Sequence, residues 1–98
     1  MDEQAEKEAY QQKLRAKLDE WQANIDKLRA QAKEASADAQ IQYQRQIDEM
    51  REQREALEAK LKDIQNAQSA AWADIKTGAD KAWDDMSKAM QDAWKRMT

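Results

Sequence analysis

The 98-residue chain contains no cysteine, no histidine, no proline and a single glycine. Without cysteine there is no disulfide, no thiol nucleophile and no thiolate metal site. Without histidine the chain lacks the side chain best suited to proton transfer near neutral pH and the commonest metal ligand. We therefore expect no enzymatic activity, no catalytic residues, no cofactor and no metal site. The absence of proline, together with the lone glycine, also removes the strongest helix breakers.

The chain also has few large apolar side chains and no strong excess of acidic or basic residues. Leucine and isoleucine supply ten residues between them, and 17 basic residues stand against 20 acidic ones for a net charge of −3. This composition excludes a thick globular core, a membrane-spanning segment and the basic surface that nucleic acid requires. The acidic beginning, residues 1–4, lacks the apolar run of a secretory signal. We therefore expect a cytoplasmic protein with no nucleic-acid partner and no small-molecule substrate.

What the chain does contain is typical of long helices. Alanine, lysine, glutamate, arginine and leucine make up 50 of the 98 residues, which is the composition of helical and coiled-coil proteins. Acidic and basic residues are mixed along the whole chain, so that no part stands apart as a charged tail. The sequence predicts an all-α fold in which residues 1–98 form one helical coiled-coil domain built from long amphipathic helices.

Apolar residues recur at steps of three and four, the spacing of one face of a helix. Between residues 14 and 39, seven steps cover 25 residues, close to a heptad repeat. Between residues 64 and 97, nine steps cover 33 residues, which fits an 11-residue repeat. We interpret this stripe as the surface through which helices associate. Its large members are Leu14, Leu18, Trp21, Ile25, Leu28, Ile47, Met50, Leu57, Leu61, Ile64, Trp72, Ile75, Trp83, Met86, Met90, Trp94 and Met97.

The 11-residue repeat runs through residues 61–97, where an Ala-Trp pair recurs three times. An amphipathic face rich in tryptophan and methionine can pack against partner helices, lie on a lipid surface or line a groove for a hydrophobic ligand. Lipid-binding helices favour lysines that flank the apolar arc, whereas Lys81 and Lys88 lie opposite it. The pattern therefore favours helix packing, with lipid binding and ligand binding as alternatives.

Two further expectations concern this stripe. Large tryptophans would fit opposite the alanine-rich residues 30–39 in an antiparallel arrangement, and a buried indole needs one hydrogen-bond partner, which Asp or Gln on a neighbouring helix could supply. Arg54 and Gln68 are polar residues within the stripe. Polar residues at such positions lower stability but fix the register or the oligomer number.

Two weak breaks interrupt the helical pattern, near residues 35–38 and 66–69. Ser36 and Ser69 are suited to be N-caps, and Thr77–Asp80 has the spacing of a capping box around the only glycine. Because the stripe keeps its phase and proline is absent, we favour continuous helix at all three sites.

Three architectures are compatible with this pattern. A single helix of 98 residues would be about 147 Å long and would need partners in other chains. A helical hairpin turning near Ser36 would leave the tryptophan repeats overhanging, and turns at both breaks would give a three-helix bundle. We favour long helices joined in a homo-oligomer, with the hairpin and the three-helix bundle as alternatives.

The chain resembles small uncharacterised bacterial coiled-coil proteins at residues 71–78 (AWADIKTG), 82–86 (AWDDM), 20–21 (EW) and 25–28 (IDKL). That resemblance covers most of the chain and implies a cytoplasmic helical protein without an assigned activity. More loosely, the 11-residue repeats are similar to those of exchangeable apolipoproteins and late-embryogenesis-abundant stress proteins. The placement of the lysines departs from the lipid-binding pattern of those helices.

These observations predict a non-enzymatic structural or protein-interaction protein that self-associates through the Leu/Ile/Trp/Met stripe, as a homo-oligomer or with partner helices. We expect self-association because the stripe has too few large residues to be buried within one chain. The alternative is a peripheral membrane-binding or stress-protective amphipathic helix, which would gain helicity on a membrane surface or on drying.

Overall fold

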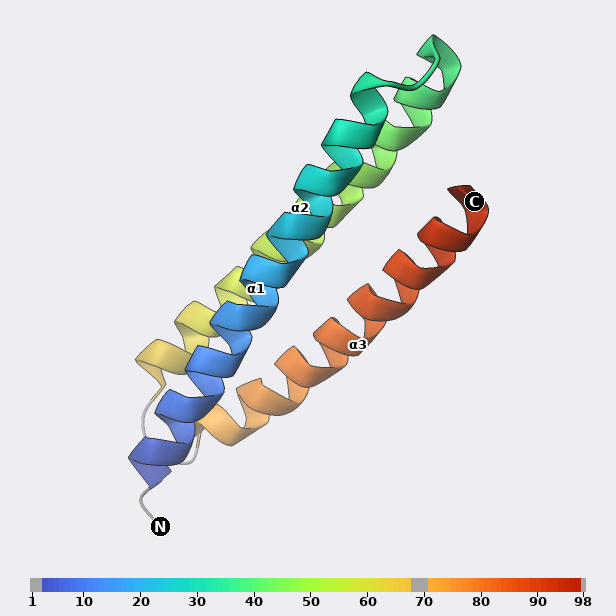
Figure 1. The fold of residues 1–98 in the computed structure, drawn as a ribbon. Coiled ribbons are helices and arrows are strands. Elements are labelled where there is room, and N and C mark those ends of the chain that lie inside the picture. Colours follow the sequence, from blue (N-terminus) through green and yellow to red (C-terminus); the bar gives the residue numbers. More distant parts are fainter. Residues whose placement is uncertain (1–2, 68–70, 98) are drawn as a thin grey trace.

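The computed structural model describes residues 3–67 and 71–97, which form three α-helices: α1 (Glu3–Lys33), α2 (Ala37–Asn66) and α3 (Ala71–Met97). No β-strand occurs in this described part of the chain. Figure 1 shows α1 and α2 as a long hairpin with α3 beside it. The all-α fold class that the composition predicts is confirmed.

The chain turns between α1 and α2 at residues 34–36. The end of α1 tightens, because the N–H groups of Glu34 and Ala35 donate to carbonyls three residues back, each at 3.2 Å. Ser36 then caps α2: its backbone is extended, with φ −63° and ψ 164°, and its hydroxyl accepts a hydrogen bond from the N–H of Ala39 at 3.4 Å. Continuous helix, which we favoured at the first weak break, is therefore wrong, and the alternative of a cap at Ser36 is what the structure shows.

Helix α2 ends at Asn66, so continuous helix at the second weak break is also wrong. Ala67 leaves the helix with φ −71° and ψ 141°, and its N–H donates to the carbonyl oxygen of Ile64 at 3.2 Å. The predicted cap at Ser69 lies outside the described residues, as does the polar stripe residue Gln68. The second turn therefore begins within the predicted range of residues.

Helix α3 runs without interruption through residues 77–80, where continuous helix is confirmed. The hydroxyl of Thr77 donates to the carbonyl oxygen of Ala73, one turn earlier in the same helix, at 3.2 Å. Thr77 thus bonds back along the helix instead of capping a new one.

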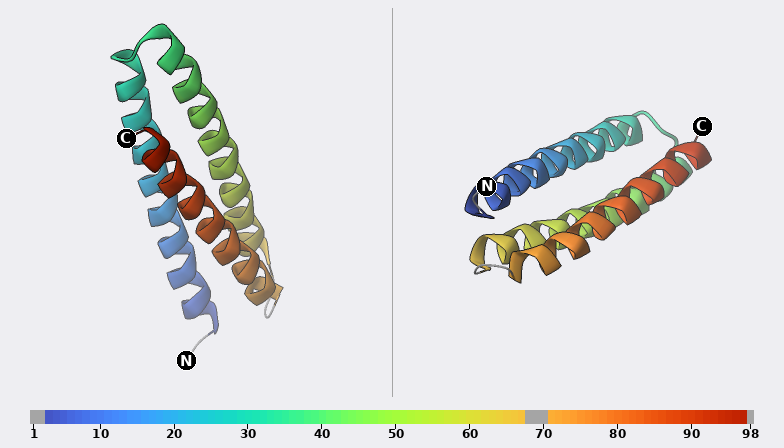
Figure 2. Two further views of the ribbon diagram at one scale, coloured as in Figure 1. Left: turned by 90° about the vertical axis from the view of Figure 1, so that its right-hand side faces the viewer. Right: turned by 90° about the horizontal axis from the view of Figure 1, so that it is seen from below.

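The three helices pack as a bundle measuring 53 × 18 × 18 Å. Helices α1 and α2 are antiparallel, and α3 reverses direction again, so that it runs parallel to α1 (Figure 2). A single 98-residue helix is therefore wrong, and so is a hairpin with overhanging tryptophan repeats. The three-helix alternative is the observed architecture, because the two turns let each apolar face be buried against another helix.

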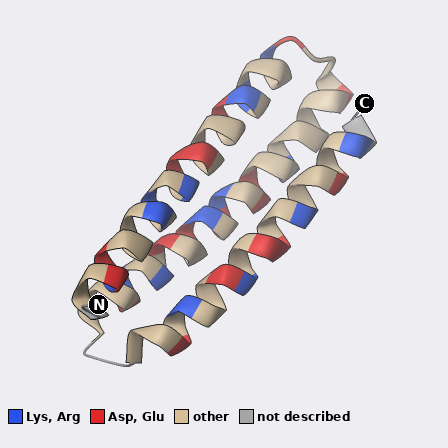
Figure 3. Ribbon diagram, turned by 60° about the horizontal axis from the view of Figure 1, so that its bottom comes forward, with Lys and Arg blue, Asp and Glu red and all other residues tan. Residues whose placement is uncertain are grey.

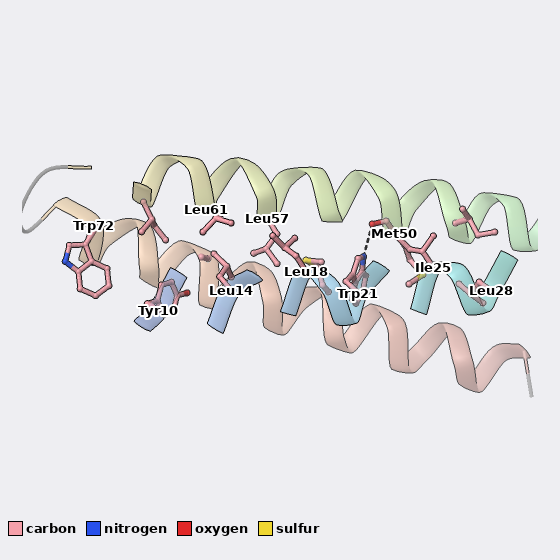
Figure 4. Close-up of a cluster of buried hydrophobic side chains, with 14 residues drawn as sticks. Tyr10, Leu14, Leu18, Trp21, Ile25, Leu28, Met50, Leu57, Leu61 and Trp72 are labelled. Atoms are coloured by element: carbon pink, nitrogen blue, oxygen red, sulfur yellow. Dashed lines mark hydrogen bonds between the residues drawn. The ribbon is translucent and has the colours of Figure 1, made fainter. Parts of the chain in front are cut away.

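The core is a row of apolar side chains between the three helices (Figure 4). Each fully buried leucine or isoleucine contributes about 1.5–3 kcal/mol to stability. Acidic and basic residues are mixed along all three helices, as Figure 3 shows, and among the described residues they are exposed or half-buried apart from Lys7. Each helix is therefore amphipathic, as its sequence predicts. The buried apolar residues are Tyr10, Leu14, Leu18, Trp21, Ile25, Leu28, Ile47, Met50, Leu57, Leu61, Ile64, Trp72, Ala79 and Met86.

Candidate functional site

The association stripe predicted from the sequence is buried within this one chain. Of its 17 large residues, twelve are buried, and Ile75, Trp83, Met90 and Trp94 are half-buried against the same core. The side chain of Met97 lies outside the described residues. The expectation that one chain could not bury the stripe is wrong, because the two turns fold it against itself. The twelve buried members are Leu14, Leu18, Trp21, Ile25, Leu28, Ile47, Met50, Leu57, Leu61, Ile64, Trp72 and Met86.

Two aromatic pairs fill the space between the parallel helices α1 and α3. The rings of Tyr10 and Trp72 are 6.2 Å apart with a tilt of 40°, and those of Trp21 and Trp83 are 5.8 Å apart, edge to face at 69°. The two pairs are separated by 11 residues on both helices, so the repeat of α3 matches an aromatic repeat of α1. Such pairs contribute about 0.5–1.5 kcal/mol beyond the area that they bury.

The tryptophan repeat therefore packs differently from the prediction. Antiparallel packing against the alanine-rich residues 30–39 is wrong for Trp72 and Trp83, because α3 runs parallel to α1 and meets its aromatic residues. Sequence reasoning missed Tyr10, which begins the aromatic repeat of α1. The available signal was its spacing, 11 residues before Trp21.

Two lysines of α1 cover tryptophans of α3. The ammonium of Lys17 lies 5.1 Å from the ring centre of Trp83, and that of Lys27 lies 5.1 Å from the ring centre of Trp94. A cation above an aromatic ring at an exposed site is worth about 0.5–1 kcal/mol. The half-buried tryptophans of α3 are thus held by electrostatic attraction as well as by packing.

Tyr10 ties α1 to α3 through its hydroxyl, which donates its hydrogen to Asp80 Oδ1 at 2.7 Å, with the carbonyl oxygen of Lys76 as a second, more distant acceptor at 3.3 Å. The ammonium of Lys76 also lies 5.4 Å from the ring centre of Tyr10. Burial raises the pKa of the Tyr10 phenol well above its usual value, and the hydrogen bond to Asp80 and the negative charge of Asp80 raise it further. The hydrogen bond that joins Tyr10 of α1 to Asp80 of α3 therefore requires a protonated phenol.

Stability is expected to fall at alkaline pH because of Tyr10. Since the folded pKa is raised above the unfolded value of about 10, the contribution is complete below about pH 10 and is lost as the pH rises from there through the raised pKa. We expect the urea midpoint to fall above pH 10 in the wild type and in Tyr43→Phe, and to fall less steeply in Tyr10→Phe. Circular dichroism follows the unfolding at each pH. If the urea midpoint falls equally steeply with pH in all three proteins, this assignment is wrong.

Trp21 lies at the centre of the stripe and is 0% exposed. Its indole N–H donates to the carbonyl oxygen of Met50 at 2.8 Å, the dashed line in Figure 4. The partner is a backbone carbonyl of α2, so the predicted Asp or Gln side chain is wrong for this indole. The Nε1 of Trp72 is buried without a hydrogen-bond partner among the described residues. The hydrogen bond from Trp21 to Met50 fixes the register in which α1 packs on α2.

Lys7 is a charged side chain buried at one end of the bundle, with 9% of its surface exposed. Its ammonium donates to the carbonyl oxygens of Ala67 at 2.7 Å and of Gln65 at 3.4 Å. These carbonyls belong to the C-terminal end of α2, where the helix dipole favours a positive charge. Lys7 of α1 thus caps α2. Sequence reasoning missed this role, because the partners are 58 and 60 residues away in the chain.

Arg54 is a polar residue of the stripe, and its side chain is partly buried at the edge of the core. Its Nη1 pairs with Glu58 Oε2 at 3.0 Å, while its Nε is buried without a hydrogen-bond partner among the described residues.

We expect Arg54→Leu to raise the free energy of unfolding by about 1 kcal/mol, because leucine needs no such partner. We also expect it to give a mixture of oligomeric states in place of a single one. Thermal melting and light scattering measure both effects; a single unchanged oligomer with an unchanged melting temperature would count against the assignment.

Metal sites, membrane-spanning helices and surface hollows are the other features by which the described residues could bind a partner. These residues contain no group of three His, Cys, Asp or Glu side chains placed to hold a metal ion. None of the described helices combines the length and the apolar character needed to cross a bilayer. The hollow between α2 and α3 beside Met50 and Met90 has a volume of about 20 Å³, which admits a water molecule but not a hydrophobic ligand. A larger, open hollow of about 280 Å³ lies between α1 and α2, where polar side chains such as Arg29 and Gln44 line it together with Ile47.

No family model, curated protein or solved structure matches this chain. The resemblance to small bacterial coiled-coil proteins and to 11-residue-repeat helices therefore stays a prediction.

Proposed function

We propose that this protein is a non-enzymatic structural or interaction protein that self-associates through the Leu/Ile/Trp/Met stripe, in the cytoplasm. The observation that carries the proposal is the stripe itself: each helix places an apolar face against another helix and leaves a mixed-charge face outside. Apolar side chains at this spacing are the means by which helices recognise one another. The expected partners are further copies of the chain or helices of similar pattern, with no role for nucleic acid or a small-molecule substrate.

Association through the stripe requires an exchange of helices, because the stripe is already covered within one chain. Ile41 is a large apolar residue that stays exposed, at 57%. A single isoleucine is far smaller than a stable protein interface, which buries about 800 Å² per partner. A partner helix therefore gains little area unless it replaces a helix of the same chain.

Size-exclusion chromatography with light scattering, from micromolar to millimolar protein and beside far-ultraviolet circular dichroism, tests the proposal. We expect a helical protein whose mass rises with concentration from 11.4 kDa to a defined oligomer. Ile41→Gln is the control: association through the stripe leaves its oligomerisation unchanged, whereas association through the exposed surface of α2 would be weakened. A helical, cooperative monomer at every concentration would overturn the proposal.

The alternative, a peripheral membrane-binding or stress-protective helix, draws on α3. Trp83, Met90 and Trp94 stay half-exposed, so part of an amphipathic face is available to a lipid interface. Trp72 and Met86 on the same helix are buried, so full insertion would need α3 to leave the hairpin. Titration with vesicles of neutral or anionic lipid separates the two functions: a blue shift of tryptophan emission with a gain in helicity supports the alternative, and no shift ends it.

A further inference from the structure

The apolar stripe of α1 repeats in α2 at a distance of 36 residues. An α-helix has 3.6 residues per turn, so 36 residues complete about ten turns and return to the same face. If the chain continued as helix through residues 34–36, the apolar faces of α1 and α2 would form one straight stripe. A hairpin does not require this relation, because its loop sets the angle between the two faces. The matching pairs are Leu14 and Met50, Trp21 and Leu57, Ile25 and Leu61, and Leu28 and Ile64.

The turn itself consists of residues that fit a helix. Glu34, Ala35 and Ser36 include neither glycine nor proline, and the first two have high helix propensity. Ser36 has a helical φ of −63°, while its ψ of 164° is extended. In a continuous helix, backbone bonds of the usual spacing replace the capping bond of Ser36. The closed turn is therefore held mainly by burial of the stripe between α1 and α2.

We propose that α1 and α2 join through residues 34–36 into one helix, Glu3–Asn66, about 96 Å long, and that two copies exchange α1 to form a domain-swapped dimer. This inference rests on the proposed self-association and names its partner, a second copy of the chain. Each α1 packs on α2 and α3 of the other copy with the contacts of the monomer. These include the indole bond from Trp21 to Met50 and the ring pair of Trp21 with Trp83.

The exchange of α1 changes few of the contacts between helices. The protein concentration therefore determines whether the closed monomer or the swapped dimer is populated. The stripe, the aromatic pairs and the cap that Lys7 provides to α2 are all rebuilt between the two copies, as in other domain-swapped dimers. The residues of the turn gain helical backbone bonds. At low concentration the closed form is favoured, because a short loop holds its helices at a high effective concentration.

A pair of substitutions at the turn separates the hairpin from the continuous helix. Ala37 is the first residue of α2 and follows the extended residue Ser36, a position where proline fits the hairpin. In a continuous helix the same proline removes a backbone bond and clashes with the preceding turn. We expect Ala37→Pro to weaken dimerisation by at least about a hundredfold while the monomer stays helical. Ser36→Ala removes the cap of the hairpin, so we expect it to strengthen dimerisation by about tenfold.

A distance within one chain reports the exchange directly. Gln12 and Ala59 are exposed and lie at the same level of the hairpin, because Trp21 faces Met50. Spin labels are attached at Gln12→Cys and Ala59→Cys, and the labelled chain is diluted with unlabelled protein. The two labels are close together in the hairpin and about 70 Å apart in a continuous helix. The chain has no native cysteine that would take a label.

We expect the long distance at the concentrations where light scattering detects a dimer, and its loss in Ala37→Pro. A dimer that keeps the short distance, or one that Ala37→Pro leaves unchanged, overturns the exchange and spares self-association. If neither the wild type nor Ser36→Ala forms any oligomer, both the exchange of α1 and self-association are overturned, and the proposed function fails with them.

Discussion

Replacement of Trp21 by alanine is expected to lower the free energy of unfolding by about 4 kcal/mol. Trp21 is 0% exposed, its indole donates to the carbonyl oxygen of Met50 at 2.8 Å, and its ring meets Trp83 edge to face. Alanine removes all three interactions and leaves a cavity at the centre of the stripe. Domains are stable by about 5–15 kcal/mol, so this loss is a large share of the total.

Urea unfolding followed by circular dichroism measures this change, with Trp94→Ala as the matched control. Trp94 is half-exposed and lies under the ammonium of Lys27, so its removal is expected to lower the free energy of unfolding by about 1–2 kcal/mol. Trp21→Phe keeps a ring but loses the indole donor, and its effect should fall between the two. Equal losses from Trp21→Ala and Trp94→Ala would contradict the central place of Trp21 in the core.

Replacement of Lys7 by methionine is expected to lower the free energy of unfolding by about 2 kcal/mol. Methionine keeps an unbranched apolar side chain but leaves the carbonyl oxygens of Gln65 and Ala67 without their charged donor. The end of α2 also loses the positive charge that its dipole favours. For a domain of this size, the change corresponds to a melting temperature lower by roughly 10 °C.

The matched control for Lys7 is Lys13→Met, a change at an exposed lysine of the same helix. Its effect on the free energy of unfolding is expected to stay within about 0.5 kcal/mol. Calorimetry of both variants decides between a specific cap and a general effect of charge. If the two substitutions lower the melting temperature equally, the capping role of Lys7 is wrong.

The helices and their buried faces could be predicted from the sequence because both depend on local spacing. Leu14, Trp21 and Leu57 recur with the period of a helix, and each lies in the core. The fold class and most of the stripe therefore follow from residues close together in the chain. Tyr10 shares the same spacing, yet a tyrosine near the end of an acidic segment gives little indication that it is buried.

The turns and the order of packing depend on residues far apart in the chain. Glu34 and Ala35 suit a helix, and Ser36 becomes a cap because the hairpin buries more apolar surface than a continuous helix would in one chain. The pairing of α3 with α1 depends on contacts such as the one between Tyr10 and Asp80, 70 residues apart. Local patterns indicate where the chain is able to turn, near residues 35–38 and 66–69, but they carry no information about such contacts. Whether the chain turns there, and which helix α3 packs against, could therefore not be predicted.

At this turn the helix propensity of the residues conflicts with burial of the stripe, and this conflict is the physical basis of the proposed exchange. Residues 34–36 suit a helix, while burial of the stripe within one chain requires a turn. When a second copy supplies the opposite face, both preferences are satisfied at once. A protein of this kind has two arrangements that bury the same side chains, and concentration selects between them.

The central claim is that the stripe joins helices between copies of the chain by opening this turn. Light scattering on the wild type and on Ala37→Pro, measured over the same series of concentrations, tests it most directly. We expect the mass of the wild type to rise from 11.4 kDa to twice that value, while Ala37→Pro stays a helical monomer. Two proteins with the same mass at every concentration, whether monomer or dimer, would contradict it.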